Sequence, residues 1–156
     1  MKYLMKTVVA VFVATVALLT YHLYPQDIVD ISGVYRVSGV NPGIMETYTG
    51  AAEIKEDPMH AGVYDIVWVM DDSPWGITAI GKGFIKDGVF IVIIRGQLFE
   101  LAGYSIQGDV LDGTWVVPGQ SGLLKEVLTK TDKKLEDAVQ PTEKAKEQMQ
   151  GSTIRL

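Results

Sequence analysis

The side chains able to carry out chemistry are few and widely separated in this sequence. The two histidines are His22, at the end of an apolar run, and His60, in a Pro-Met-His-Ala-Gly turn. A metal site needs several converging ligands, and neither histidine has Asp or Glu partners at ligand spacing. The neighbours Asp71 and Asp72 offer too few oxygens for a calcium ion. The sequence therefore predicts no metal site and no cofactor.

Nucleophilic catalysis also lacks its usual set of residues. A catalytic serine sits on a sharp turn beside a base, and neither Ser105 nor Ser121 has that setting. The segment GQSG at 119–122 lies between two strand patterns and is typical of a hairpin turn. The absence of cysteine excludes a thiol nucleophile, a thiolate metal site and disulfides. We expect a protein without catalytic residues that is not an enzyme.

One pair of charges is placed within apolar strand patterns. Alternate residues of a strand share a face, so Glu126 lies on the face of Leu124 and Leu128, and Arg95 on the face of Ile93. If these faces point inward, both charges become interior groups, which are costly unless they are paired. Such a pair could form the polar end of a ligand cavity.

Two alternatives to this interior placement remain open at the sequence level. Both charges could lie near a rim and reach water, or Phe90, Val92 and Ile94 could form the inward face instead. The candidates for a ligand cavity are Arg95, Glu126, Tyr48 and Trp68. We expect Tyr35 and Trp115 to be core aromatics, because Trp115 alternates with polar residues along its strand.

Eight strand patterns would position these side chains. They lie at about 34–38, 47–55, 63–70, 77–85, 89–95, 100–107, 110–117 and 123–131, and helical periodicity is absent between them. Turn residues separate them, including Asp57-Pro58, Lys86-Asp87-Gly88 and Gly108-Asp109. The pattern predicts an antiparallel meander.

A meander without a covering helix leaves exposed edges unless it closes into a barrel. Glycines within the strands, such as Gly81, Gly83, Gly103 and Gly113, favour the bending that closure needs. We therefore predict an all-β fold, an eight-stranded barrel over residues 27–131, with a two-sheet sandwich as the alternative. A barrel of this size encloses side chains or one small ligand.

Residues 1–26 predict a signal-anchor helix before the barrel. Lys2 and Lys6 precede an apolar run whose length approaches that of a bilayer span, and no clear cleavage site follows it. We expect residues 7–24 to cross the membrane once, with the N-terminus in the cytoplasm and the domain outside. The alternatives are a cleaved signal peptide, which would leave a periplasmic or secreted domain, and a buried soluble helix.

The net charge of the chain and the composition of its C-terminal residues limit the kinds of partner that we expect. A formal net charge of −5 disfavours nucleic acid, whose phosphates an acidic domain repels. Residues 132–156 are charged, contain no aromatic residue and include Pro141, which predicts a flexible tail. A docking peptide for a protein partner is the alternative reading of this tail.

Several segments also carry a resemblance. They are GVYRVSGVNPG at 33–43, YTGAAEI at 48–54, YDIVWVM at 64–70, GDVLDGTWV at 108–116 and KEVLTKT at 125–131. They resemble a family of small exported bacterial barrel domains, some loosely called fibronectin-binding-like and others uncharacterised. The resemblance covers about residues 30–130 and implies a barrel and an exported location, but no activity. The chain departs from the pattern at 124–129, and it has fewer glycines after the fifth strand. The hairpins are also similar to those of avidin-like and lipocalin-like barrels, which bind small apolar ligands.

Two functions fit these observations. The first is a membrane-anchored extracytoplasmic binding or accessory module without catalytic activity, which takes a protein partner or a small apolar ligand. The second is a structural or envelope-interaction protein that acts through the acidic barrel surface or the C-terminal tail.

Overall fold

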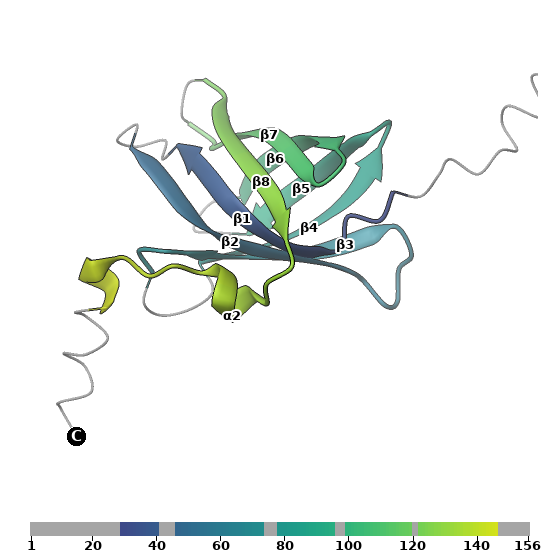
Figure 1. The fold of residues 1–156 in the computed structure, drawn as a ribbon. Coiled ribbons are helices and arrows are strands. Elements are labelled where there is room, and N and C mark those ends of the chain that lie inside the picture. The colour runs from purple at the N-terminus through teal and green to yellow at the C-terminus, as the bar shows by residue number, and fades with distance from the viewer. Residues whose placement is uncertain (1–28, 41–45, 74–77, 96–98, 120–121, 147–156) are drawn as a thin grey trace, which may run out of the picture. The chain divides into compact units, whose positions relative to one another are not determined.

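A computed structural model describes residues 29–40, 46–73, 78–95, 99–119 and 122–146. The elements are β1 (Gly33–Val40), β2 (Thr47–Glu56), β3 (Val63–Met70), β4 (Ala79–Lys86), β5 (Val89–Arg95), β6 (Phe99–Gln107), β7 (Val110–Val116), β8 (Leu124–Thr131) and α2 (Leu135–Ala138). Each strand pairs antiparallel with the next, and β1 pairs with β8 to close a barrel (Figure 1). The predicted barrel is confirmed and the two-sheet sandwich is wrong.

The two ends of the barrel differ in their connections. At one end, which we call the hairpin end, short turns join β2 to β3, β4 to β5 and β6 to β7. The turns β4–β5 and β6–β7 have two residues each, and in the first of these Asp87 and Gly88 have φ values of 51° and 76°. An Asp-Gly pair with positive φ at both positions is the turn that matches the twist of a hairpin, as the sequence predicted. The connections β1–β2, β3–β4, β5–β6 and β7–β8 leave from the opposite end, which we call the loop end.

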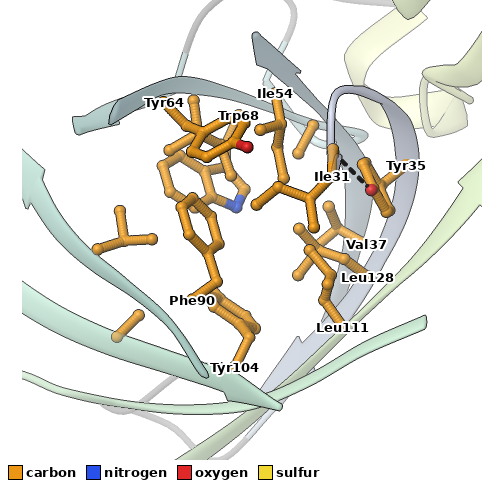
Figure 2. Close-up of a cluster of buried hydrophobic side chains, with 14 of the residues drawn as sticks. Ile31, Tyr35, Val37, Ile54, Tyr64, Trp68, Phe90, Tyr104, Leu111 and Leu128 are labelled. Atoms are coloured by element: carbon orange, nitrogen blue, oxygen red, sulfur yellow. Dashed lines mark hydrogen bonds between the residues drawn. The ribbon is translucent and has the colours of Figure 1, made fainter. Parts of the chain in front are cut away.

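An apolar core lies inside the barrel among the described residues. Figure 2 shows its aromatic rings beside its aliphatic side chains, and the largest members, each at most 2% exposed, include Tyr35, Tyr64, Trp68, Phe90, Tyr104, Ile54 and Leu128. The ring of Tyr64 meets the ring of Phe90 edge-on, with centroids 5.9 Å apart. The Tyr35 hydroxyl donates a hydrogen bond of 2.7 Å to the carbonyl oxygen of Ile31, so this buried phenol is satisfied. Tyr35 is a core residue, as predicted.

Glycines in the strands make room for these rings. A β-carbon at Gly83 would lie 2.8 Å from the Phe90 ring, and one at Gly113 would overlap the ring of Tyr104. Both glycines face inward beside the aromatic residue of the neighbouring strand. Their lack of a side chain therefore allows the neighbouring aromatic residue to occupy the interior.

The segment after β8 contacts the outer face of β1 and β2. Asp71, at the end of β3, accepts hydrogen bonds from both terminal nitrogens of Arg36 at 2.8 and 3.1 Å, and from the backbone N–H of Gln140 at 2.7 Å. Arg36 also donates to the carbonyl oxygen of Ala138 at 2.8 Å. Ala51 faces outward from β2 and is nevertheless fully buried. Part of the segment that composition predicts as a flexible tail thus lies against the barrel.

The predicted membrane-spanning helix, over residues 7–24, lies outside the described residues. Across the ranges that the structure does describe, no helix combines the length and the apolar character needed to cross a bilayer.

Candidate functional site

Glu126 is a buried carboxylate inside the barrel. It is the third residue of β8, only 5% exposed, and it shares the inner face with Leu124 and Leu128. The alternation of β8 therefore runs as the sequence predicted. Because Glu126 lies near the start of β8, its carboxylate is nearer the loop end than the hairpin end.

Three aromatic side chains donate hydrogen bonds to this carboxylate. The Tyr104 hydroxyl and the Trp68 indole N–H reach Oε1 at 2.6 and 3.3 Å, and the Tyr48 hydroxyl reaches Oε2 at 2.5 Å. Among the described residues, no lysine or arginine forms an ion pair with Glu126. The carboxylate is thus held by neutral donors, without a counter-charge.

The sheet register explains why both tyrosines reach the same carboxylate. Glu126 pairs with Gly39 on β1 and with Gly113 on β7. Gly39 pairs in turn with Tyr48 on β2, and Gly113 pairs with Tyr104 on β6. The five residues form one row across five strands, in which a glycine separates the acid from each tyrosine. Each phenol ring lies over its glycine, where a β-carbon would collide with it, and its hydroxyl meets Glu126.

Burial shifts the pKa values of Glu126 and of the acidic and phenolic groups around it. It raises the pKa of Glu126 above the usual 4.5, against the opposing effect of the three hydrogen bonds. Burial and the neighbouring carboxylate also raise the pKa values of Tyr48 and Tyr104 well above the usual 10, so both phenols remain protonated donors. Burial, followed by the charge of Glu126, raises the pKa of Glu100 as well. The acids, rather than the phenols, are therefore the groups that titrate here.

Glu100 and Trp115 lie close to this network. Glu100 shares the inner face of β6 with Tyr104, and its carboxylate is close enough to Glu126 to feel its charge. Trp115 is half-buried against the core, and its indole nitrogen is fully buried with no hydrogen-bond partner among the described residues. The same N–H still lies near enough to the Tyr48 hydroxyl to lower the pKa of that phenol, although no hydrogen bond with good geometry joins them. The site thus holds a donor without a good acceptor.

The structure brings together three of the four residues predicted for a cavity, namely Glu126, Tyr48 and Trp68. Arg95 is not among them. It is exposed on the outer face of β5, and Phe90, Val92 and Ile94 point inward, so the interior placement of Arg95 is wrong. The reason is that β5 is apolar on both faces, and its composition does not decide which face is inside.

Besides Glu100, sequence reasoning missed Tyr104 as a residue of this site. Its own strand pattern marks it only as a candidate core aromatic. Its bond to Glu126 depends on the registers of β6 with β7 and of β7 with β8, which the turns set. The pairing of a glycine with an aromatic residue on the next strand is a signal that could have found it.

A metal centre has no donor set in the part of the chain that the structure covers. No three His, Asp or Glu side chains there could hold an ion together. His60 lies in an exposed turn, 3.2 Å from the carboxylate of Asp57.

No protein family, curated protein or solved structure matches the chain. The resemblance to exported barrel domains therefore stays a prediction.

Proposed function

We propose that this protein is a non-catalytic binding module that holds a small ligand inside the barrel, against Glu126. One observation carries the proposal: a 5%-exposed carboxylate is held by three aromatic donors and has no counter-charge among the described residues. Burying a charge without a counter-charge is costly, and ionisable groups whose pKa is shifted by burial cluster at functional sites.

The geometry favours a ligand with an apolar body and one hydrogen-bond donor, such as an amine or a hydroxyl. Oε1 of Glu126 accepts two hydrogen bonds, but Oε2 accepts one, so it can accept another from a ligand. Aromatic rings around a few polar groups are the usual lining of small-molecule sites. The unpartnered N–H of Trp115 adds a donor that a ligand acceptor can use.

The setting that we propose is the outer side of a membrane, with residues 7–24 as the anchor. Two sequence features support it: the apolar run with preceding lysines, and the resemblance to exported domains. The alternative of a secreted or periplasmic domain, left after signal cleavage, uses the same barrel site.

The test compares three benzene derivatives that differ only in the attached group: benzylamine, benzyl alcohol and toluene. The full chain is kept in an uncharged detergent, and its thermal unfolding is followed with each compound. We expect benzylamine or benzyl alcohol to raise the unfolding temperature more than toluene does. Glu126→Gln should remove this difference, whereas Tyr35→Phe, a change to a phenol that bonds Ile31 and not Glu126, should preserve it. Equal shifts in the wild type and in Glu126→Gln would reject the site.

A further inference from the structure

The outer wall of the barrel carries a second concave site, separate from the interior. A hollow of about 650 Å³ lies over β3, β4 and β5. Its apolar lining includes Val63, Val67, Ile80, Phe84 and Ile93. This volume is within the range of small-molecule sites, which span about 300–1,000 Å³ and are mostly apolar with a few polar groups.

Three of the apolar side chains of this hollow are exposed to solvent. Ile80, Phe84 and Ile93 are 43%, 49% and 56% exposed. Ile80 and Phe84 lie four residues apart on β4, so the hollow extends about 13 Å along that strand. Leu101, opposite Ile93 on β6, is 50% exposed and continues the apolar surface. Contiguous exposed apolar surface of this kind marks a binding site.

Three charged side chains line the hollow, namely Asp65 on β3, Lys82 on β4 and Arg95 on β5. The charged side chains on the outer faces of β4 and β5 are Lys82, Lys86 and Arg95, although the chain as a whole is acidic. The acid of β6, Glu100, faces inward. Lys82 is already neutralised by Asp57 at 2.6 Å and Asp65 at 2.9 Å.

Arg95 differs from Lys82 in having no ion pair and no hydrogen bond within the described parts of the chain. It lines the hollow at the loop end, where it pairs with Ile80 across β4 and β5. The opposite end of the hollow, at Phe84 and Val63, is apolar. Among the described residues, the hollow therefore has one unpaired positive charge at its loop end, a mostly apolar lining, and the Lys82–Asp65 ion pair between its two ends.

We propose that this hollow binds a single-chain anionic amphiphile, with the negative head group on Arg95 and the apolar chain along β4. A guanidinium recognises a carboxylate or a phosphate through paired hydrogen bonds, and the chain covers the exposed apolar side chains. A second copy of the protein would also cover the exposed apolar side chains, and its formation is one outcome of the test below. An anionic bilayer fits less well, because Asp57 and Asp65 border the β3 side of the hollow.

The experiment uses two dodecyl probes with a photoreactive diazirine in the chain, one with a carboxylate head and one with a trimethylammonium head. The full chain in uncharged micelles is irradiated with each probe, and the labelled peptides are located by mass spectrometry. Because the readout gives positions, labels in residues 1–28 are scored separately from labels on β3–β5. We expect about tenfold more labelling of β3–β5 by the carboxylate probe, from a charge-assisted hydrogen bond to Arg95.

Two variants make the result specific. Arg95→Glu should reverse the preference of β3–β5 for the carboxylate probe, and Lys125→Glu, an equal charge change on the exposed face of β8, should preserve it. Circular dichroism confirms that each variant retains its fold. Equal labelling by the two probes, or a preference that survives Arg95→Glu, would overturn the proposal.

Two further experiments test the other possible occupants of the hollow, an anionic bilayer and a second copy of the protein. In the first, the protein is irradiated in vesicles that contain a diazirine-bearing phosphatidylglycerol. If this lipid labels β3–β5 and the free carboxylate probe does not, the occupant of the hollow is a bilayer and not a single-chain amphiphile. In the second, analytical ultracentrifugation measures the oligomeric state in the same micelles. A dimer that is lost in Ile93→Ser would mean that a second copy of the protein occupies the hollow. Either result would overturn the proposal.

Discussion

Glu126 couples the folding of the barrel to pH in a direction opposite to that of most carboxylates. Its pKa rises above 4.5 on folding, so between 4.5 and the raised value the folded state holds a proton that the unfolded state has released. Stability therefore falls as the pH rises through that window, and the contribution of Glu126 is fully present below 4.5. Asp71 acts in the opposite sense: hydrogen bonds from Arg36, Thr49 and Gln140 outweigh the effect of its burial and lower its pKa, so its contribution is lost in acid.

Glu126→Gln isolates the first effect, because glutamine does not titrate and every other group remains. We expect the free energy of unfolding of the wild type, minus that of the variant, to increase as the pH falls from neutral to below 4.5. Urea denaturation at a series of pH values measures both curves. A difference that stays constant with pH, or that decreases in acid, would show that Glu126 is not held with a raised pKa.

Trp115 allows a test of which residues of β7 face the barrel interior. It faces inward from β7 and packs against the core, while Asp112 faces outward and lies 3.6 Å from Lys125. Trp115→Ala should lower the free energy of unfolding by about 3 kcal/mol, because a cavity forms in place of the ring. Asp112→Ala should change it by less than about 1 kcal/mol, since an exposed ion pair contributes little. Chemical denaturation of both variants checks the prediction, and equal losses would contradict the inward orientation of Trp115.

Asp71 connects β1, β2 and the segment that follows β8. Its carboxylate binds Arg36 on β1, Thr49 on β2 and the backbone of Gln140, and its carbonyl oxygen accepts from the N–H of Thr142 at 2.9 Å. The helix α2 has only four residues and no side-chain cap, so it is too short to be stable by itself. These contacts, together with the burial of Ala138, are what hold the segment after β8 against β1 and β2.

Asp71→Ala should therefore release this segment and leave the barrel closed. We expect a loss of about 3 kcal/mol in the free energy of unfolding, the usual effect of breaking a buried charge pair. Amide hydrogen exchange should accelerate at Gln140 and Thr142 and remain slow in the strands. Asp72→Ala, at the exposed neighbouring position, provides the control. Fast exchange in β1 and β2 as well would mean that Asp71 supports the barrel itself.

The sequence predicted the strands well because turn residues bound them and most of them alternate in character. The same logic made an interior position one of the two readings for Glu126, since β8 has a single apolar face, but it did not orient β5, where Val92 and Ile93 are equally apolar. The bond between Glu126 and Tyr104 depends on the register of three strands, and the bonds of Asp71 join residues far apart in the sequence. Such contacts follow from the closed barrel, and local patterns contain no signal for them.

At the scale of the whole molecule, closure rests on the pairing of β1 with β8, which joins the two ends of the meander. Val127 on β8 is opposite Ser38 on β1 and opposite Asp112 on β7. Because the chain has no cysteine, a disulfide from position 127 to either partner can be introduced without competing thiols. The bond to position 38 closes a loop of about 90 residues and the bond to position 112 one of about 16, which predicts stabilisation by about 4–5 and about 3 kcal/mol respectively.

We expect the oxidised Ser38→Cys/Val127→Cys variant to unfold at a higher temperature than the oxidised Asp112→Cys/Val127→Cys variant. The reduced forms of both serve as references, and differential scanning calorimetry supplies the comparison. If the bond to position 112 stabilised the protein as much as the bond to position 38, the longer loop closed between β1 and β8 would bring no additional stability, which would contradict the prediction.

The row in which Gly39 and Gly113 separate Glu126 from its two tyrosines also has an evolutionary consequence. A larger residue at either glycine collides with a phenol ring, and a smaller residue at either tyrosine leaves a void above a glycine. Neither member of a pair can change alone without loss. Across related sequences, positions 39 and 48, and likewise positions 104 and 113, should therefore covary, and the glycine should be replaced only where the tyrosine has also been lost.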